Sequence, residues 1–150
     1  MATPRFHLQR VLDYRTNVVD RLRLELAVAE AQVSRERSAL GALQADEQLL
    51  IARQCAQQDS GCTIDDMVHV SGQFDLLRVR VRQQEVVLQR AEAEADEAWS
   101  RLEEASKSMK TLERLRDRHT EEWRQEERRL ERIESAEIAA RHGVAARSRA

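Results

Sequence analysis

The sequence predicts an all-α protein, a long antiparallel two-helix coiled-coil hairpin whose second helix overhangs the first. Three observations support this fold class. The 150 residues are 35% charged and 3% aromatic, with one Pro and four Gly, which is typical of long helices and unusual for a compact globular core. Apolar residues recur every three or four positions in two long runs. One short break, "QQDSGCTIDD", separates the two runs.

The first helix is expected at about residues 5–57. Its seam repeats over six heptads, and ten of its thirteen positions are apolar, which favours a left-handed coiled coil over a single amphipathic surface helix. The seam positions are Leu8, Leu12, Arg15, Val19, Leu22, Leu26, Ala29, Val33, Glu36, Leu40, Leu43, Glu47 and Leu50.

A turn is expected at residues 58–63. Asp59, Ser60 and Gly61 favour a turn, and Gly61 suits a left-handed helix cap. Thr63 can cap the next helix, with Asp66 completing a capping box. Because a short connection places two helices side by side, the second helix should run antiparallel to the first.

The second helix is expected at about residues 64–140, followed by a basic tail at 141–150, within a single domain of 1–150. Sixteen of its twenty seam positions are apolar. They are Met67, Val70, Phe74, Leu77, Val81, Gln84, Leu88, Ala91, Ala95, Ala98, Leu102, Ala105, Met109, Leu112, Arg116, His119, Trp123, Glu126, Leu130 and Ile133.

The two helices differ in length, roughly 80 Å against 115 Å at about 1.5 Å per residue. Folding at the turn places residue 8 beside about residue 115, so the helix beyond about residue 118 has no partner in its own chain. Trp123, Leu130 and Ile133 nevertheless continue the apolar stripe. An apolar stripe on a lone helix predicts a docking surface.

Catalysis and cofactor binding are not expected. The sequence has no phosphate-binding glycine loop, no nucleophile with a base and no metal-ligand spacing, and the separation of Cys55 and Cys62 does not match a zinc motif. The carboxylates of the cluster at 121–127 should pair with nearby arginines on a solvated helix face. A net charge of -2 with interleaved acids argues against nucleic-acid binding. No long apolar stretch or signal core is present, so we expect a soluble cytoplasmic protein that binds no small-molecule substrate.

The N-terminal run "FHLQRVLDYRTNVVDRLRLELAVAE" resembles the start of the FliJ family of flagellar protein export. The positions that carry the resemblance are Phe6, Leu8, Gln9, Val11, Leu12, Arg15, Glu25, Leu26 and Ala27. "GQF" at 72–74, Trp99 and the segment 110–119 resemble later parts of the family.

The resemblance implies a coiled coil similar to the central stalk of rotary ATPases. It implies binding to the hexameric flagellar export ATPase (FliI-like), whose assembly and activity the protein promotes, to the export gate protein (FlhA-like) and to export chaperones. The ATPase would contact Leu112, His119, Trp123, Leu130 and Ile133. The export gate protein would contact Gln48, Phe74 and Val81. The protein would associate peripherally with the inner-membrane export apparatus.

Three alternatives stay open at this point. One is the equivalent stalk of a virulence-type injectisome, and another is a generic scaffold coiled coil, in the form of a parallel homodimer. The break at "DSGCT" favours a hairpin monomer over a parallel rod. The third alternative is narrower, a pH switch at His119.

Overall fold

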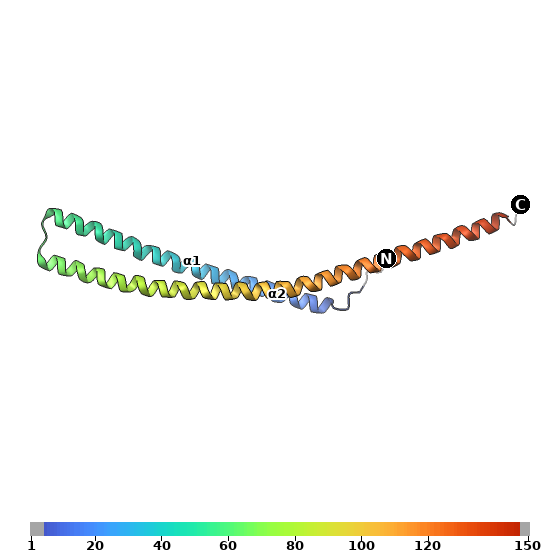
Figure 1. Ribbon diagram of the computed structural model, residues 1–150, viewed down its shortest axis with the longest axis horizontal. Coiled ribbons are helices and arrows are strands. Elements are labelled where there is room, and N and C mark those ends of the chain that lie inside the picture. Colours follow the sequence, from blue (N-terminus) through green and yellow to red (C-terminus); the bar gives the residue numbers. More distant parts are fainter. Residues whose placement is uncertain (1–4, 148–150) are drawn as a thin grey trace. The chain divides into compact units, whose positions relative to one another are not determined.

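A computed structural model describes residues 5–147, and the side chains of residues 5–142. Helix α1 (Gln9–Ser60) and helix α2 (Ile64–Arg147) are joined by residues 61–63 and pack against each other (Figure 1). Within residues 5–147 there is no strand. The predicted two-helix hairpin is therefore confirmed. With 52 residues in α1 and 84 in α2, the second helix is longer by 84 − 52 = 32 residues.

The predicted seams account for the packing of both helices. In α1, every seam position except Arg15 is buried or half-buried. Thr16 is covered in its place, and its hydroxyl donates a hydrogen bond to the Leu12 carbonyl over 3.0 Å. Burying a guanidinium without a partner would cost more than burying a hydroxyl that is already hydrogen-bonded. The arginine therefore faces solvent.

The second seam is covered at sixteen of its twenty positions. The exposed ones are Met67, Glu126, Leu130 and Ile133. Met67 lies in the first turn of α2, and the buried part of the seam begins at Val70. The other three lie near the far end of α2, where the sequence predicts that no partner helix remains.

The chain forms two compact units. The first contains residues up to Val19 together with residues from Ala105 onward, and the second is Asp20–Glu104. Phe6, Leu12 and Val19 are the buried apolar residues of the first unit, and Leu26, Val70, Ala91 and Ala98 are those of the second. The expectation that all 150 residues act as one domain stays a prediction.

A polar layer interrupts the seam of the second unit. The Gln84 amide donates to the Glu36 carboxylate over 2.6 Å and to the Glu36 carbonyl over 3.1 Å. Both residues are half-buried, and Arg37 pairs with Glu92 nearby over 3.0 Å. A polar pair at a seam position favours the one alignment of two helices that satisfies its hydrogen bonds. This layer therefore helps to set the register of the hairpin.

The turn follows the predicted chemistry. Gly61 has a φ of 96°, the left-handed conformation that ends a helix at glycine. The Thr63 hydroxyl accepts a hydrogen bond from the Asp66 amide over 3.2 Å, and the Asp66 carboxylate accepts from the Thr63 amide over 3.1 Å. The capping box is confirmed. Helix α1 continues to Ser60, three residues past the predicted end, and the turn shortens to residues 61–63.

Removal of this cap by Thr63→Ala is expected to lower Tm by about 2–4 °C. Hydrogen bonds from the Thr63 hydroxyl and then its backbone lower the pKa of Asp66 below its ordinary value. A lowered folded-state pKa contributes stability above the ordinary aspartate pKa, near about 3.9, that disappears as pH falls through the folded-state value. Thermal melts of the unmodified chain and of the Thr63→Ala variant measure the difference in Tm, which should be smaller at acidic pH than at neutral pH. An equal difference in Tm at both pH values would contradict the contribution of the Asp66 carboxylate.

Helix α2 continues to Arg147, seven residues beyond the predicted end at 140. Alanines surround Gly143 in this stretch, and one glycine costs a helix only about 1 kcal/mol relative to alanine. Arg141 also pairs with Glu137 over 3.7 Å, one helical turn away. Most of the predicted basic tail is thus helical, and residues 148–150 lie outside the described part of the chain.

Candidate docking surfaces

The N-terminal residues of the first unit cover part of α2. The Gln9 amide donates to the Phe6 carbonyl over 3.0 Å, so the chain turns just before α1 begins. The Phe6 side chain is buried, and its ring centre lies 6.0 Å from that of His119. This turn lengthens the cover on α2, and the uncovered part begins later than the expected residue 118.

Three of the five predicted ATPase-docking residues are half-buried: Leu112, His119 and Trp123. The Nδ1 atom of His119 is buried and has no hydrogen-bond partner among the described residues. Its imidazole packs on the Phe6 ring. These three side chains therefore offer a partner only part of their surface.

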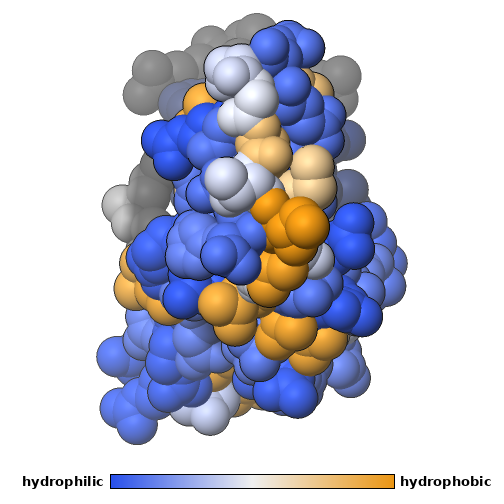
Figure 2. All heavy atoms as spheres, turned by 90° about the vertical axis from the view of Figure 1, so that its left-hand side faces the viewer, coloured by the Kyte–Doolittle hydropathy of each residue, from blue (hydrophilic) through white to orange (hydrophobic). Residues whose placement is uncertain are grey.

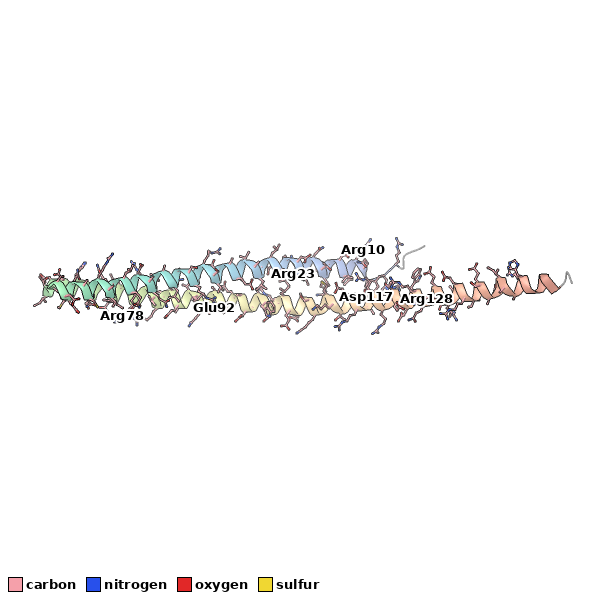
Figure 3. The ribbon with its side chains drawn as sticks, turned by 90° about the horizontal axis from the view of Figure 1, so that it is seen from above. Arg10, Arg23, Arg78, Glu92, Asp117 and Arg128 are labelled. Carbon is pink, nitrogen blue, oxygen red and sulfur yellow. The ribbon has the colours of Figure 1, made fainter. Side chains whose placement is uncertain are left out.

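The other two predicted residues lie on an exposed segment of α2, Arg128–His142, which we call the free segment. Every side chain in it is exposed. Leu130 is 55% exposed and Ile133 is 46% exposed. In Figure 3, Arg128 lies on α2 beyond the start of α1, where Arg10 is labelled. Ile138 is also exposed, and the heptad pattern does not predict it as a docking residue because it lies one position off the seam.

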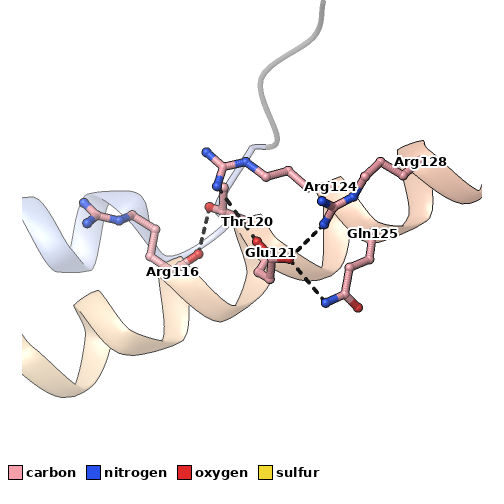
Figure 4. Close-up of polar contacts among 6 residues, drawn as sticks. All are labelled: Arg116, Thr120, Glu121, Arg124, Gln125 and Arg128. Atoms are coloured by element: carbon pink, nitrogen blue, oxygen red, sulfur yellow. Dashed lines mark hydrogen bonds and ion pairs between the residues drawn. The ribbon is translucent and has the colours of Figure 1, made fainter.

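Ion pairs along α2 stabilise the start of the free segment and the helical turns that precede it. Glu121 accepts hydrogen bonds from Arg128 over 3.0 Å and from Gln125 over 3.3 Å, and it pairs with Arg124 over 3.9 Å (Figure 4). Arg129 pairs with Glu126 over 2.8 Å. Such pairs within one helix each stabilise it by about 0.2–0.5 kcal/mol. The carboxylates thus form the solvated ionic face that the sequence predicts.

The predicted gate-docking residues lie in the second unit. Gln48 is exposed on α1, whereas Phe74 and Val81 are half-buried in the seam of α2. A groove of about 290 Å³ runs beside them between the helices. It is lined by Asp46, Leu49, Leu50, Arg53, Gln73, Leu76, Leu77 and Arg80.

Leu49 and Leu76 are 58% and 65% exposed in this groove. Reading the sequence for its seam missed both, because they lie off it. Further apolar side chains are exposed in the first turns of α2, at Ile64, Met67 and Val68. Figure 2, which views the hairpin from the end bearing the turn, shows orange apolar residues gathered there. This end of the second unit therefore presents more apolar surface than the sequence predicts.

Across the described residues, no group of three or more His, Cys, Asp or Glu side chains is placed to hold a metal ion. In the same part of the chain, no helix combines the length and the apolar character that a membrane span requires. Cys55 and Cys62 are free thiols.

Comparison with known proteins identifies the family. Residues 4–148 match the family model described as flagellar FliJ protein. The chain belongs to the FliJ family. The resemblance seen in the N-terminal run is thus confirmed over nearly the whole length. No curated protein and no solved structure gives a significant match.

Membership of the FliJ family makes this chain a coiled-coil component of flagellar protein export. The family match favours the flagellar assignment over the injectisome and scaffold alternatives. The antiparallel packing of α1 and α2 excludes the parallel rod as the structure of the chain.

Proposed function

We propose that the free segment of α2 docks into the hexameric flagellar export ATPase, and that the chain acts there as a central-stalk-like coiled coil. The observation that carries the proposal is the exposure of Leu130 and Ile133 on a helix segment that nothing in the described structure covers. Apolar side chains in a helical row are typical of a surface that inserts into a groove of a partner.

The side chains of the free segment are compatible with binding inside a ring of ATPase subunits. Arginines and glutamates surround Leu130 and Ile133, and Arg128 and Arg129 are already paired within the helix. Such a surface makes shallow apolar contacts with several subunits in turn and needs no deep pocket. His119 and Trp123, half-buried at the edge of the N-terminal cover, would contact the rim of the ring, and Leu112 would hold the helix in place behind them.

Binding to the assembled ring would promote assembly by mass action. A ligand that binds the hexamer and not the free subunit shifts the equilibrium toward the hexamer. Hydrolysis of ATP would then rise because more complete active sites form, and the chain would supply no catalytic group. The proposed role is that of an assembly factor and not of an enzyme.

A second contact, with the export gate, belongs to the same proposal. Gln48, Phe74 and Val81 would form its centre, and the exposed Leu49 and Leu76 in the adjoining groove would enlarge it. Escort of export chaperones is the third part of this proposal, and membership of the FliJ family supports it. Both roles would place the chain in the cytoplasm, peripherally associated with the inner-membrane export apparatus.

Site-specific cross-linking tests the ATPase contact. A photo-reactive residue at position 130 or 133 should cross-link to the ATPase when nucleotide supports hexamer formation. The same residue at position 24, where Leu24 is also exposed but lies in the second unit, should not. Equal cross-linking at all three positions, or none at 130 and 133, would contradict the assignment.

The gate contact has its own test. Changing Leu49 and Leu76 to Gln should weaken binding of the gate's cytoplasmic domain about tenfold, because each side chain contributes apolar area. Changing Leu24 and Val28 to Gln provides a control of equal exposure on the same unit. A similar loss in both double variants would show that the groove has no special role.

A further inference from the structure

One apolar face of the second unit belongs to neither proposed contact. Val79, Val86 and Val87 are 45%, 46% and 40% exposed on α2. Their spacing, with Gln83 between them, puts them on one face of the helix. The seam residues Val81 and Leu88 pack on the opposite side against α1. This valine face therefore points away from the hairpin interior.

The valine face is hollowed. A shallow cavity of about 550 Å³ lies over it, lined by Val79, Arg82, Gln83, Val86, Val87 and Arg90. Short β-branched valines and longer arginines line this cavity together. Its shape suits a ridge of larger apolar side chains from a partner.

The sequence around this face carries a local excess of positive charge. Arg82 and Arg90, which line this cavity, have no carboxylate partner in the part of the chain that the structure describes, and neither has Arg78. Several other arginines do pair with acids, for example Arg37 with Glu92 and Arg129 with Glu126. Residues 78–90 hold four arginines and one glutamate, a net charge of 4 − 1 = +3, although the whole chain carries -2. The face thus combines apolar area with uncompensated positive charge.

We propose that the valine face binds an acidic amphipathic helix of a partner protein. The apolar stripe of such a helix would fill the cavity, and its flanking carboxylates would pair with Arg82 and Arg90 in bidentate fashion. Electrostatic complementarity of this kind gives specificity as well as speed of association. The interaction would be independent of both contacts proposed above.

The neighbouring sequence limits the extent of the site. Residues 92–104 hold six acids and one arginine, a net charge of 1 − 6 = −5. An acidic partner would be repelled there, so its footprint would end near Arg90. A second copy of this chain could offer the same acidic stretch to the valine face, but it is not the better partner. The large apolar side chain exposed in this stretch is Trp99, at 57%, and a single side chain does not form the apolar row that would fill the cavity.

A membrane surface fits the face less well than a protein helix. Helices that lie in a bilayer interface insert long apolar side chains such as Trp, Phe and Leu to a depth of about 5–10 Å. The side chains here are valines, which cannot reach that depth. The other side of α2 is occupied by α1, so the helix cannot rotate to present a larger stripe.

Two synthetic helical peptides of about 18 residues, roughly 27 Å long, test the proposal on the full chain. Both carry leucines in one helical row, and the rows are flanked by Glu in one peptide and by Lys in the other. Fluorescence anisotropy should show micromolar binding of the Glu peptide and much weaker binding of the Lys peptide. Arg82→Glu with Arg90→Glu should reverse this preference, each affinity changing about tenfold or more.

Matched variants separate the face from general effects. Val79→Gln with Val86→Gln should weaken binding of the Glu peptide, and Arg10→Glu with Val11→Gln should leave it unchanged. Val11 has similar exposure, at 43%, and Arg10 lies in the first unit. All these positions are exposed, so the helix content of each variant should stay at the level of the unmodified chain.

Five results would overturn the proposal. In the first two, neither peptide binds, or both peptides bind equally well. Peptide binding does not respond to the charge reversal. The chain sediments with phosphatidylglycerol vesicles through the same arginines and the Glu peptide does not compete, which would assign the face to a lipid surface. Light scattering shows a dimer that the charge reversal dissociates, which would assign it to a second copy.

Discussion

Changing Leu130 and Ile133 to Gln is expected to weaken binding of the chain to the flagellar export ATPase by about tenfold to a hundredfold. Full burial of one such side chain is worth about 1.5–3 kcal/mol. Because Leu130 is 55% and Ile133 is 46% exposed before binding, the two together contribute about 1.5–3 kcal/mol on docking, and about 1.4 kcal/mol corresponds to a tenfold change in affinity. Both residues already face solvent in the free chain. The double variant should therefore keep its Tm, and calorimetric titration with the ATPase measures the loss.

The control for this experiment has the same chemistry in another place. Leu24→Gln with Val28→Gln removes two side chains that are at least as exposed, on the second unit. Its affinity for the ATPase should equal that of the unmodified chain. If the Leu130 and Ile133 double variant binds as tightly as this control, the free segment is not the docking surface.

Val19→Asp is expected to have the largest effect on stability. Val19 is fully buried, with no exposed surface, in the first unit. A carboxylate placed there would be desolvated without a partner, which costs about 3 kcal/mol or more. Thermal unfolding followed by circular dichroism should show a lower Tm. The backbone amides around Phe6 and His119 should also lose protection from hydrogen exchange.

Asn17→Asp is the matched control, because Asn17 is exposed two residues earlier on the same helix. It introduces the same charge without burying it, so its Tm should stay close to that of the unmodified chain. Equal Tm values for the two aspartate variants would contradict the packing described for the first unit.

Much of the hairpin could be predicted because the physics is local. The heptad spacing identifies which residues of α1 and α2 meet, and Thr63 and Asp66 form their capping box within four residues of sequence. Glycine at position 61 predicts the end of α1 for the same reason. These signals depend on neighbours in the chain and on little else.

The surfaces could be predicted less well because they depend on residues far away in sequence. The turn that lets Phe6 reach His119 covers part of the docking region expected to be free, and no periodic pattern encodes it. Leu49 and Leu76 lie off the seam, and only the packed hairpin shows that they share a groove.

The same holds for charge. Composition shows a nearly neutral chain, and spacing predicts that arginines pair with acids along a helix. Only the structure distinguishes Arg128 and Arg129, which have such partners, from Arg82 and Arg90, which do not. The lack of acidic partners beside the valine face is therefore a property that the structure shows and the sequence does not predict.

The central claim, that this FliJ-family chain promotes assembly of the export ATPase, has one direct measurement. ATP hydrolysis by the cognate flagellar export ATPase is followed with and without the chain, together with the mass of the ATPase in the same sample. The account predicts faster hydrolysis and a shift of the ATPase to a hexamer, both lost when Leu130 and Ile133 are changed to Gln. Unchanged hydrolysis with unchanged mass would contradict it.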